Sequence, residues 1–390
     1  MARFDDIWEA ELVHREQAGR LRRLRTTERL GEGRIRTGGR ILVDFCSNDY
    51  LGLARHPALA ERAAVFAGRW GTGSGASRLV SGNLEPLEEL EQKVARAKGS
   101  EAALLMASGW QANASVLPAL LDPRILPGEP LVFADELNHA SMRHGCRAAR
   151  ARVLGYRHLD LDHLESLLRE HAAHPGPKFV LSETVFSMDG DVAEVPALVA
   201  LAERHGAFLY LDDAHATGVL GREGYGLAAG LGAEVGLVVG TFGKALGAYG
   251  AYVACSRRLR DFLVNRCSGI VYSTSMPPPV LGAIDAAWEL VPSLGPQRDR
   301  LHENARRLRE RLRSAGVDVG RSTTQIVPAI LGADERAVRV AASLEEAGFL
   351  ALPIRPPTVP EGTSRIRLSV CAHHRPEEID RLVDALVAAL

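Results

Sequence analysis

Short, continuous runs of apolar residues recur along the middle of the chain, separated by stretches with helical periodicity. Between residues 47 and 285 these runs predict strands in AALLMAS (102–108), PLVFADE (130–136), KFVLSETVF (178–186), AFLYLDDA (207–214), GLVVGTF (236–242) and AYVACS (251–256). A strand with one solvent-exposed face would alternate apolar and polar residues, whereas these runs are continuous. They predict a mainly parallel sheet with helices on both faces, and therefore an α/β fold.

The segments between the runs carry the signals of helices. PLEELEQKVARAKG (86–99) and VPALVALAERHG (195–206) repeat apolar residues at helical spacing. Each segment closes on a glycine, as many helix C-termini do. We expect residues 47–285 to form one large domain around the predicted sheet.

The two ends of the chain have a different organisation. Residues 1–46 predict an arm with one helix and a short hairpin that turns at Gly38–Gly39. In RLRRLR (20–25) arginine is interleaved with leucine, which predicts the solvated side of that amphipathic helix. Beyond the prolines of YSTSMPPPV (272–280), a helix at 299–316 and strands at 325–331 and 364–370 predict a smaller C-terminal α/β domain over 286–390.

Composition narrows the classes of function. The chain has 390 residues, 46% hydrophobic and 24% charged, as in an ordinary globular protein with room for two domains. A net charge of −1 offers no basic field for nucleic acid or an anionic membrane. Five scattered cysteines without CxxC spacing favour reduced thiols over disulfides or zinc. The acidic N-terminus lacks the apolar segment of a secretory signal, so we expect a cytoplasmic protein that binds no metal.

One apolar stretch contains an unexpected charge. VGLVVGTFGKALGAYGAYVAC (235–255) carries a single charged residue, Lys244. A run of about twenty apolar residues can span a membrane. The lysine near its middle, the repeated glycines and the missing charged flanks argue against a spanning helix. The stretch predicts a strand, a turn and a second strand in a protein core.

Lys244 stands just past one predicted strand, and Asp212 stands at the end of another. Ligands of open α/β sheets bind at the carboxyl ends of the strands. A lysine and an aspartate there suit pyridoxal 5′-phosphate (PLP), because the amine forms a Schiff base with the aldehyde and the carboxylate pairs with the pyridinium nitrogen. The alternative is a surface lysine whose ammonium reaches solvent. We predict that Lys244 and Asp212 lie in one cleft.

Three segments offer groups for the phosphate or for a close approach. In ASGWQAN (107–113), Ser108 and Gly109 precede a predicted helix, whose free N–H groups and dipole favour an anion, although this can also be an ordinary helix start. Thr241, three residues before Lys244, adds a hydroxyl. GTGSGAS (71–77) lacks the GK[ST] of a P-loop. It predicts either a loop that a ligand or partner chain approaches closely, or a flexible turn.

Two histidines follow predicted strands. His215 comes three residues after Asp212, and His139 follows the strand 130–136. A single histidine is usually structural, but two at strand ends of one sheet point to the site. His139 could stack on a planar ring.

Several motifs together resemble one known family. TFGKALG (241–247), DDAHATGVLG (212–221), SETVFSMDGD (182–191), SNDYLGL (47–53) and GSGASRLVSGN (73–83) are similar to those of the α-oxoamine synthases. These are fold-type-I PLP-dependent enzymes, which condense an amino acid with an acyl thioester and release carbon dioxide. The likeness covers nearly the whole chain. It implies a PLP-binding large domain, a small C-terminal domain and an N-terminal helical arm.

The resemblance implies cofactor roles for the matching residues. Lys244 would carry the Schiff base, Asp212 would pair with the ring nitrogen, and His139 would stack on the ring. His215, the fourth catalytic residue, would lie with Ser187 near the ring hydroxyl. Thr241 and the backbone of Gly109 and Trp110 would lie near the phosphate, and Ser275 would come from the partner subunit of a homodimer. Trp110 departs from the Phe or Tyr expected there.

The resemblance also implies substrate contacts. Arg367 would hold the carboxylate of the amino acid, for which a guanidinium is suited because it forms two parallel hydrogen bonds. The other substrate contacts would be Arg22, Asn48, His139, Arg355 and Thr358.

Two stretches bear on the substrates. YSTSMPPP (272–279) and IRPPTVPEGTSRIRL (354–368) most resemble the family member of biotin biosynthesis, which uses L-alanine and a pimeloyl thioester. Whether the thiol carrier is coenzyme A or an acyl carrier protein stays open. A sister synthase that uses glycine or serine would share every catalytic residue. An aminotransferase of this fold should lack the two stretches, and a non-catalytic binding or scaffold subunit would tend to lose Lys244.

Overall fold

The computed structural model describes residues 2–390, which form two compact units. The central unit comprises Asp49–Ser187 and Asp191–Arg298. The terminal unit comprises the residues up to Asn48, the short segment Met188–Gly190, and Asp299–Leu390. The chain therefore returns to the terminal unit twice after leaving it.

These divisions differ from the boundaries at 46–47 and 285–286 drawn from the sequence. The N-terminal arm groups with the C-terminal residues because β3 (Arg40–Asp44) pairs in parallel with β12 (Phe349–Leu350). Helix α10 (Pro278–Leu290) stays in the central unit, where it packs along α2 (Pro57–Trp70).

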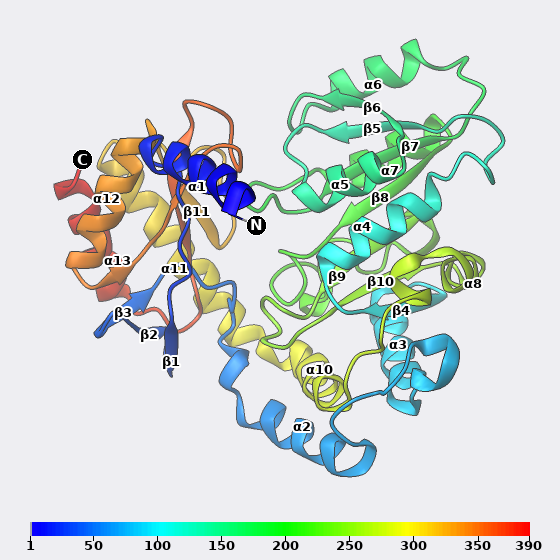
Figure 1. Ribbon diagram of the computed structural model, residues 1–390, viewed down its shortest axis with the longest axis horizontal. Helices are drawn as coiled ribbons and strands as arrows, with labels where there is room; N and C mark the ends of the chain where they lie inside the picture. The colour runs from blue at the N-terminus through cyan, green and yellow to red at the C-terminus, as the bar shows by residue number, and fades with distance from the viewer. Residues whose placement is uncertain (1) are drawn as a thin grey trace. The chain divides into compact units, whose positions relative to one another are not determined.

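A seven-stranded sheet forms the middle of the central unit (Figure 1). Its strand order is β4 (Ala102–Met106), β10 (Ala251–Cys255), β9 (Leu237–Thr241), β8 (Ala207–Asp212), β7 (Lys178–Glu183), β5 (Leu131–Asp135) and β6 (Arg152–Tyr156). Neighbouring strands from β9 to β6 are parallel, and β10 is antiparallel to both β9 and β4. The expected mainly parallel sheet is confirmed, with all six predicted strands. The edge strand β6 was not predicted.

Helices cover both faces of this sheet. One face packs against α4 (Gly109–Leu120), α5 (Ala140–Ala148), α8 (Arg257–Arg266) and α9 (Ser268–Val271) in one core of buried apolar side chains. Helices α3 (Glu85–Lys98) and α7 (Val195–Arg204) contact β4, β10 and β8, and α6 (Leu161–Glu170) contacts β5 and β6. Side chains alternate between faces along a strand, so the continuous apolar runs supply both layers.

The apolar stretch with the lysine forms an antiparallel pair, as predicted. Strand β9 pairs with β10, with Thr241 opposite Ala251, and the turn between them carries Lys244. Within residues 2–390, no helix combines the length and the apolar character needed to cross a membrane.

The terminal unit contains two small sheets. One has the order β1 (Thr27–Gly31), β2 (Arg34–Thr37), β3, β12, and the other β11 (Ile326–Gly332), β14 (Ser364–Ser369), β13 (Pro353–Ile354). The helices are α1 (Ala2–Gln17), α12 (Asp334–Glu346), α13 (Pro376–Ala388) and most of α11 (Gly295–Ser314). The predicted hairpin forms between β2 and β3, with Gly38 and Gly39 in the left-handed conformation at its turn.

The prediction for RLRRLR was wrong. Helix α1 ends at Gln17, Gly19 has a φ of 64°, and residues 20–25 lie outside any helix or strand. Arg20 forms ion pairs with Asp334 and Glu361, and Arg25 pairs with Glu345. The arginines therefore contact acidic groups of the terminal unit, which local periodicity cannot reveal.

Candidate active site

Asp212 is held at the carboxyl end of β8. Its Oδ2 accepts a hydrogen bond of 2.8 Å from Asn113 Nδ2, and its Oδ1 accepts one of 3.0 Å from the backbone N–H of Ala214. Asn113 lies in α4, where its Oδ1 accepts a 2.6 Å hydrogen bond from the hydroxyl of Tyr210. Asp212 is 7% exposed, and its carboxylate is fixed at both oxygens.

The neighbouring Asp213 has a different environment. Its Oδ2 lies 2.7 Å from Nζ of Lys98 on α3, and both side chains are almost fully buried. Its Oδ1 accepts hydrogen bonds from Thr184 Oγ1 and from the backbone of Leu227. Asp213 therefore forms a structural ion pair, and of the two neighbouring aspartates Asp212 is the one available to the site.

The charges of Lys244 and Asp212 shift the pKa values of the same two neighbouring side chains, His139 and Glu183. Burial lowers the pKa of His139, the charge of Asp212 opposes this, and the charge of Lys244 lowers the pKa further. Burial and Asp212 hold the pKa of Glu183 well above its usual range, while Lys244 acts in the opposite direction. Lys244 and Asp212 are therefore both close to His139 and Glu183, as the predicted shared cleft requires.

The turn that carries Lys244 is fixed by its backbone. Hydrogen bonds run from Gly247 N to Lys244 O (2.9 Å) and from Ala248 N to Phe242 O (2.9 Å). Gly247 has a φ of 63°, and a Cβ there would lie 2.2 Å from the backbone N of Ala54. A glycine is required because a larger residue would collide with a neighbouring backbone. Gly247 thus holds the turn of Lys244 in place.

The N-terminus of α4 faces Thr241. Ser108 caps the helix, with its Oγ accepting from Gln111 N at 3.1 Å. The N–H groups of Gly109 and Trp110 have no intrahelical acceptor at this position. A Cβ on Gly109 would lie 2.7 Å from Cγ2 of Thr241, so helix and strand end meet closely. Thr241 Oγ1 is buried and has no hydrogen-bond partner among residues 2–390. These donors fit a phosphate group.

His139, His215 and Ser187 follow β5, β8 and β7. His139 is the N-cap of α5, and its Nδ1 lies 2.6 Å from Ser141 Oγ. His215 is 5% exposed, with Nδ1 2.8 Å from the hydroxyl of Tyr50. Ser187 is also buried.

Trp110 is half exposed beside the site. Its ring meets the ring of His139 edge-on, with centroids 6.2 Å apart, and lies 5.5 Å from the ring of His144. It therefore contacts the histidine that was expected to stack on the cofactor ring.

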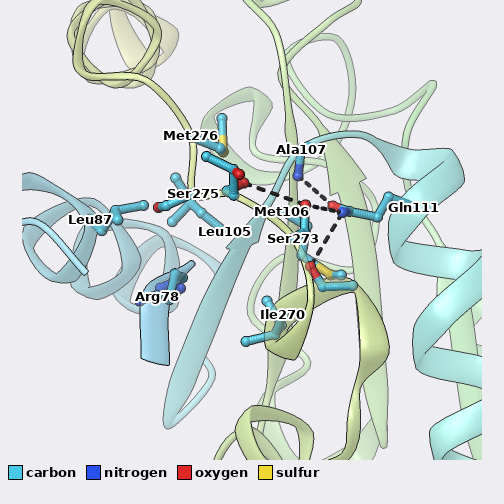
Figure 2. Close-up of a pocket in the computed structure, with 12 residues that line it drawn as sticks. Arg78, Leu87, Leu105, Met106, Ala107, Gln111, Ile270, Ser273, Ser275 and Met276 are labelled. Carbon is cyan, nitrogen blue, oxygen red and sulfur yellow. Dashed lines mark hydrogen bonds between the residues drawn. The ribbon is translucent and has the colours of Figure 1, made fainter. Parts of the chain in front are cut away.

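Ser275 lies next to the glycine-rich loop. Its backbone N–H donates to Ala76 O (3.0 Å), and its carbonyl accepts from Ser74 Oγ (2.8 Å). Ser275 is one of the residues that line a small cavity (Figure 2). The cavity has a volume of about 20 Å³, enough for one water molecule. Gln111 connects this cavity with the start of α4: it accepts from Ala107 N (2.8 Å) and donates to Ser273 Oγ (3.1 Å). The Ser275 hydroxyl is buried and has no partner within the described residues.

Apart from His139, which lies in the central unit, the predicted substrate residues belong to the terminal unit. Arg367 on β14 donates to Ser369 Oγ (2.6 Å) and to Asn48 Oδ1 (3.2 Å). Arg22 donates to Thr358 Oγ1 (3.3 Å), and its charge contributes to lowering the pKa of Arg355, which burial lowers most. The five residues therefore form two groups, Arg367 with Asn48, and Arg22 with Thr358 and Arg355.

Sequence reasoning missed Asn113, Glu183 and Tyr50 as members of the site. Glu183 ends β7 directly opposite Asp212, and its Oε1 is buried without a partner among residues 2–390. A carboxylate closing an apolar run was the available signal, the same one that identified Asp212. Asn113 had a weaker signal, an amide inside an apolar helical segment.

Comparison with known proteins agrees with this geometry. Residues 40–386 match the family Aminotransferase class I and II, and the chain belongs to that family. More specifically, an 8-amino-7-oxononanoate synthase of Gluconacetobacter diazotrophicus is 52% identical over 99% of this chain and 97% of its own length. A protein of Paramagnetospirillum magneticum, named provisionally for the same activity, is 58% identical over 96% of this chain and 95% of its own.

A solved structure supports the fold. A serine palmitoyltransferase variant from S. paucimobilis, with bound PLP and myriocin, matches with a TM-score of 0.90 and 27% identity, covering 100% of this chain and 97% of that one. The fold class, family and enzyme class expected from the sequence are confirmed.

Proposed function

We propose that this chain condenses L-alanine with a pimeloyl thioester to give 8-amino-7-oxononanoate, carbon dioxide and the free thiol carrier, a step of biotin biosynthesis. One observation carries the proposal: hydrogen bonds through Asn113 and Ser141 link Asp212 to His139, and the charge of Lys244 lowers the pKa of the same histidine. The chain is also similar, over 99% of its length, to a protein named for this activity. Lys244 is retained, which argues against a non-catalytic subunit.

The site fits PLP as its cofactor. The N–H groups of Gly109 and Trp110 and the unpartnered hydroxyl of Thr241 would hold the phosphate. Asp212 would hold the ring nitrogen, His139 one ring face, and His215 and Ser187 the ring hydroxyl. Lys244 would bond to the aldehyde carbon. When bound, PLP supplies an electron sink for the charge that develops on the α-carbon of the amino acid.

The chain's own residues would then handle binding and proton transfer. Lys244 Nζ would accept the α-proton of alanine and later return a proton to the same carbon. Arg367 orients the substrate by holding its carboxylate through two hydrogen bonds. Burial and the charge of Asp212 hold the pKa of Glu183 well above its usual range, which favours its neutral form beside Asp212.

The remaining assignments are also proposals. Arg22, Asn48, Arg355 and Thr358 would contact the substrates. The chain would act in the cytoplasm as a homodimer, with Ser275 directed towards the partner's phosphate site. The thiol carrier would be coenzyme A or an acyl carrier protein.

Spectroscopy and product analysis test the function. The purified protein is loaded with PLP, given L-alanine, glycine or L-serine, and then pimeloyl-CoA. We expect the visible absorption of bound PLP to change with alanine, and thiol and carbon dioxide to be released when pimeloyl-CoA is added. Pimeloyl-acyl carrier protein in a parallel arm identifies the carrier.

Lys244→Ala is the control variant. It should keep its fold by circular dichroism and show neither the lysine-bound absorption nor turnover. A response to glycine or serine with another acyl thioester would favour a sister synthase, a possibility that the structural likeness to serine palmitoyltransferase raises. Steady turnover by Lys244→Ala would refute the role of the lysine.

A further inference from the structure

Three buried titratable side chains form a cluster that the proposed chemistry does not use. His158 Nδ1 lies 2.9 Å from Asp135 Oδ1, and His158 Nε2 lies 2.9 Å from Asp191 Oδ2. The side chain of His158 is 11% exposed, that of Asp135 is fully buried and that of Asp191 is 6% exposed. Both ring nitrogens therefore face a carboxylate, so the ring can satisfy both only with two protons.

Asp135 fixes the segment that leads to His139. It ends β5, and its Oδ1 and Oδ2 accept from the backbone N–H groups of Leu137 and Leu159, both at 2.9 Å. Its carbonyl accepts from Asn138 N at 3.1 Å. The residue that follows Asn138 is His139, the cap of α5. The path of the backbone into His139 thus depends on the orientation of the Asp135 carboxylate.

Asp191 closes the hairpin that contains Ser187. The backbone N–H of Phe186 donates to Asp191 O at 3.1 Å, and Val185 pairs with Val192. The ring of Phe186 meets the ring of His158 edge-on, with centroids 4.4 Å apart. His158 therefore contacts both sides of the hairpin base, and Ser187 is the next residue after Phe186.

The charge of the cluster favours the doubly protonated ring. Burial lowers the pKa of His158, but hydrogen bonds to Asp135 and Asp191 outweigh it and raise the pKa to about 9. Besides these two carboxylates, Glu136 faces the segment, where its Oε1 accepts from the backbone N–H of His158 at 3.2 Å. At neutral pH an imidazolium therefore links two buried carboxylates.

We propose that His158 is a positioning residue of the cofactor site, holding the loop that presents His139 and the hairpin that presents Ser187 at a fixed spacing. This inference rests on the proposed PLP site. Because one side chain joins the segments after β5 and β7, its loss releases both together. His158 acts through Asp135 and Asp191 and has no direct part in the reaction.

The affinity for PLP tests the proposal. His158→Gln keeps a polar side chain but cannot carry the charge or reach both carboxylates at once. We expect PLP to bind about ten- to hundredfold more weakly, the range of a lost hydrogen bond to a charged group. His14→Gln, on the exposed helix α1, is the matched control and should bind PLP like the wild type.

A second measurement needs no cofactor. In the apo-protein with isotope-labelled histidine, one imidazole should remain doubly protonated up to about pH 9, and its NMR signal should be missing from His158→Gln. If that variant does not fold, the near-isosteric Asp191→Asn should show weaker PLP binding in its place. If no imidazole of the wild-type protein stays doubly protonated up to about pH 9, the proposal is overturned even when neither variant folds.

The outcomes separate this inference from the proposed function. Wild-type protein that never gains the absorption of bound PLP would overturn the function and, with it, the role of His158. Wild-type protein that binds PLP while folded His158→Gln binds it equally well would overturn the role of His158 alone. A double variant, His158→Gln with Asp191→Asn, should lose no more affinity for PLP than His158→Gln alone. Both changes break the same contact, the one between His158 and Asp191.

Discussion

Asn113 uses every hydrogen-bonding group of its side chain inside the site. Besides accepting from Tyr210, it donates to Asp212 and, at 2.9 Å, to Ser141 Oγ. Ser141 in turn contacts His139. One amide therefore joins the carboxylate expected at the ring nitrogen with the histidine expected at the ring face. Buried networks that are fully satisfied in this way are rigid, which preorganises a site before its ligand arrives.

At the same scale, the Thr241 hydroxyl should be a phosphate ligand. It is buried and unpartnered within residues 2–390, a cost that a bound phosphate would remove. We expect Thr241→Val, which keeps the shape and deletes the hydroxyl, to weaken PLP binding about ten- to hundredfold in fluorescence titrations. Thr241→Ser should stay near the wild type. Equal affinities for all three proteins would show that the hydroxyl does not contact the cofactor.

The position of a single residue in the fold was predictable where one rule applied. Polar residues directly after apolar runs gave Lys244, Asp212, His139 and His215, because parallel strands end at one edge of a sheet. Asn113 sits inside a helix, and its partners are distant in sequence, so local pattern could not assign it. Arg367 came from family resemblance alone. Its contact with Asn48 spans more than three hundred residues of sequence.

Among the elements, the junction of α4 with β9 has little spare room. We expect Gly109→Ala to displace the first turn of α4, because the added Cβ would lie 2.7 Å from Cγ2 of Thr241. PLP affinity should fall, whereas affinity for pyridoxal, which lacks the phosphate, should change little. Gly155→Ala on β6, where nothing lies within 4 Å, is the matched control. An equal loss for both ligands would place the defect outside the phosphate site.

Elements were predictable where burial was uniform. The strands from β7 to β10 lie between two helical layers, so their sequences are continuously apolar. Strand β6 was missed because it is an edge strand with mostly exposed or half-buried residues. The prediction for RLRRLR was wrong although its spacing suited a helix. Gly19 and ion pairs with residues remote in sequence set the conformation of this segment.

At the scale of the whole molecule, buried histidines link stability to pH. In the terminal unit, His374 stacks on Phe45 with centroids 4.0 Å apart. Its Nδ1 accepts from the backbone N–H of Cys371 at 3.1 Å, so a proton there would face another donor. Burial, with a smaller effect of the charge of His373, lowers the pKa of His374 from 6.5 to about 4. The folded state thus prefers the neutral ring.

The sign of the effect follows from this shift. Below pH 6.5 the unfolded chain takes up a proton that the folded chain refuses until about pH 4. The contribution of His374 to stability is therefore fully present above pH 6.5 and falls by about 1.4 kcal/mol per pH unit as the pH drops towards 4. Urea unfolding at pH 7 and pH 5 should show a smaller acid loss for His374→Gln than for the wild type. Identical losses would contradict the assignment.

The division of the chain into units has a consequence during synthesis. The strands of the central sheet are complete once Cys255 has been made, and the segment assigned to the central unit ends at Arg298. In the terminal unit, Val43 is made early, but its partner Phe349 appears about three hundred residues later. Domains generally fold as units while the chain emerges from the ribosome, so the central unit forms first. Until β12 has been made, the edge of β3 that pairs with it stays unpaired. A stop codon anywhere before β12 would leave that edge open, so truncated products should be recognised by chaperones and proteases even when Lys244 is correctly placed.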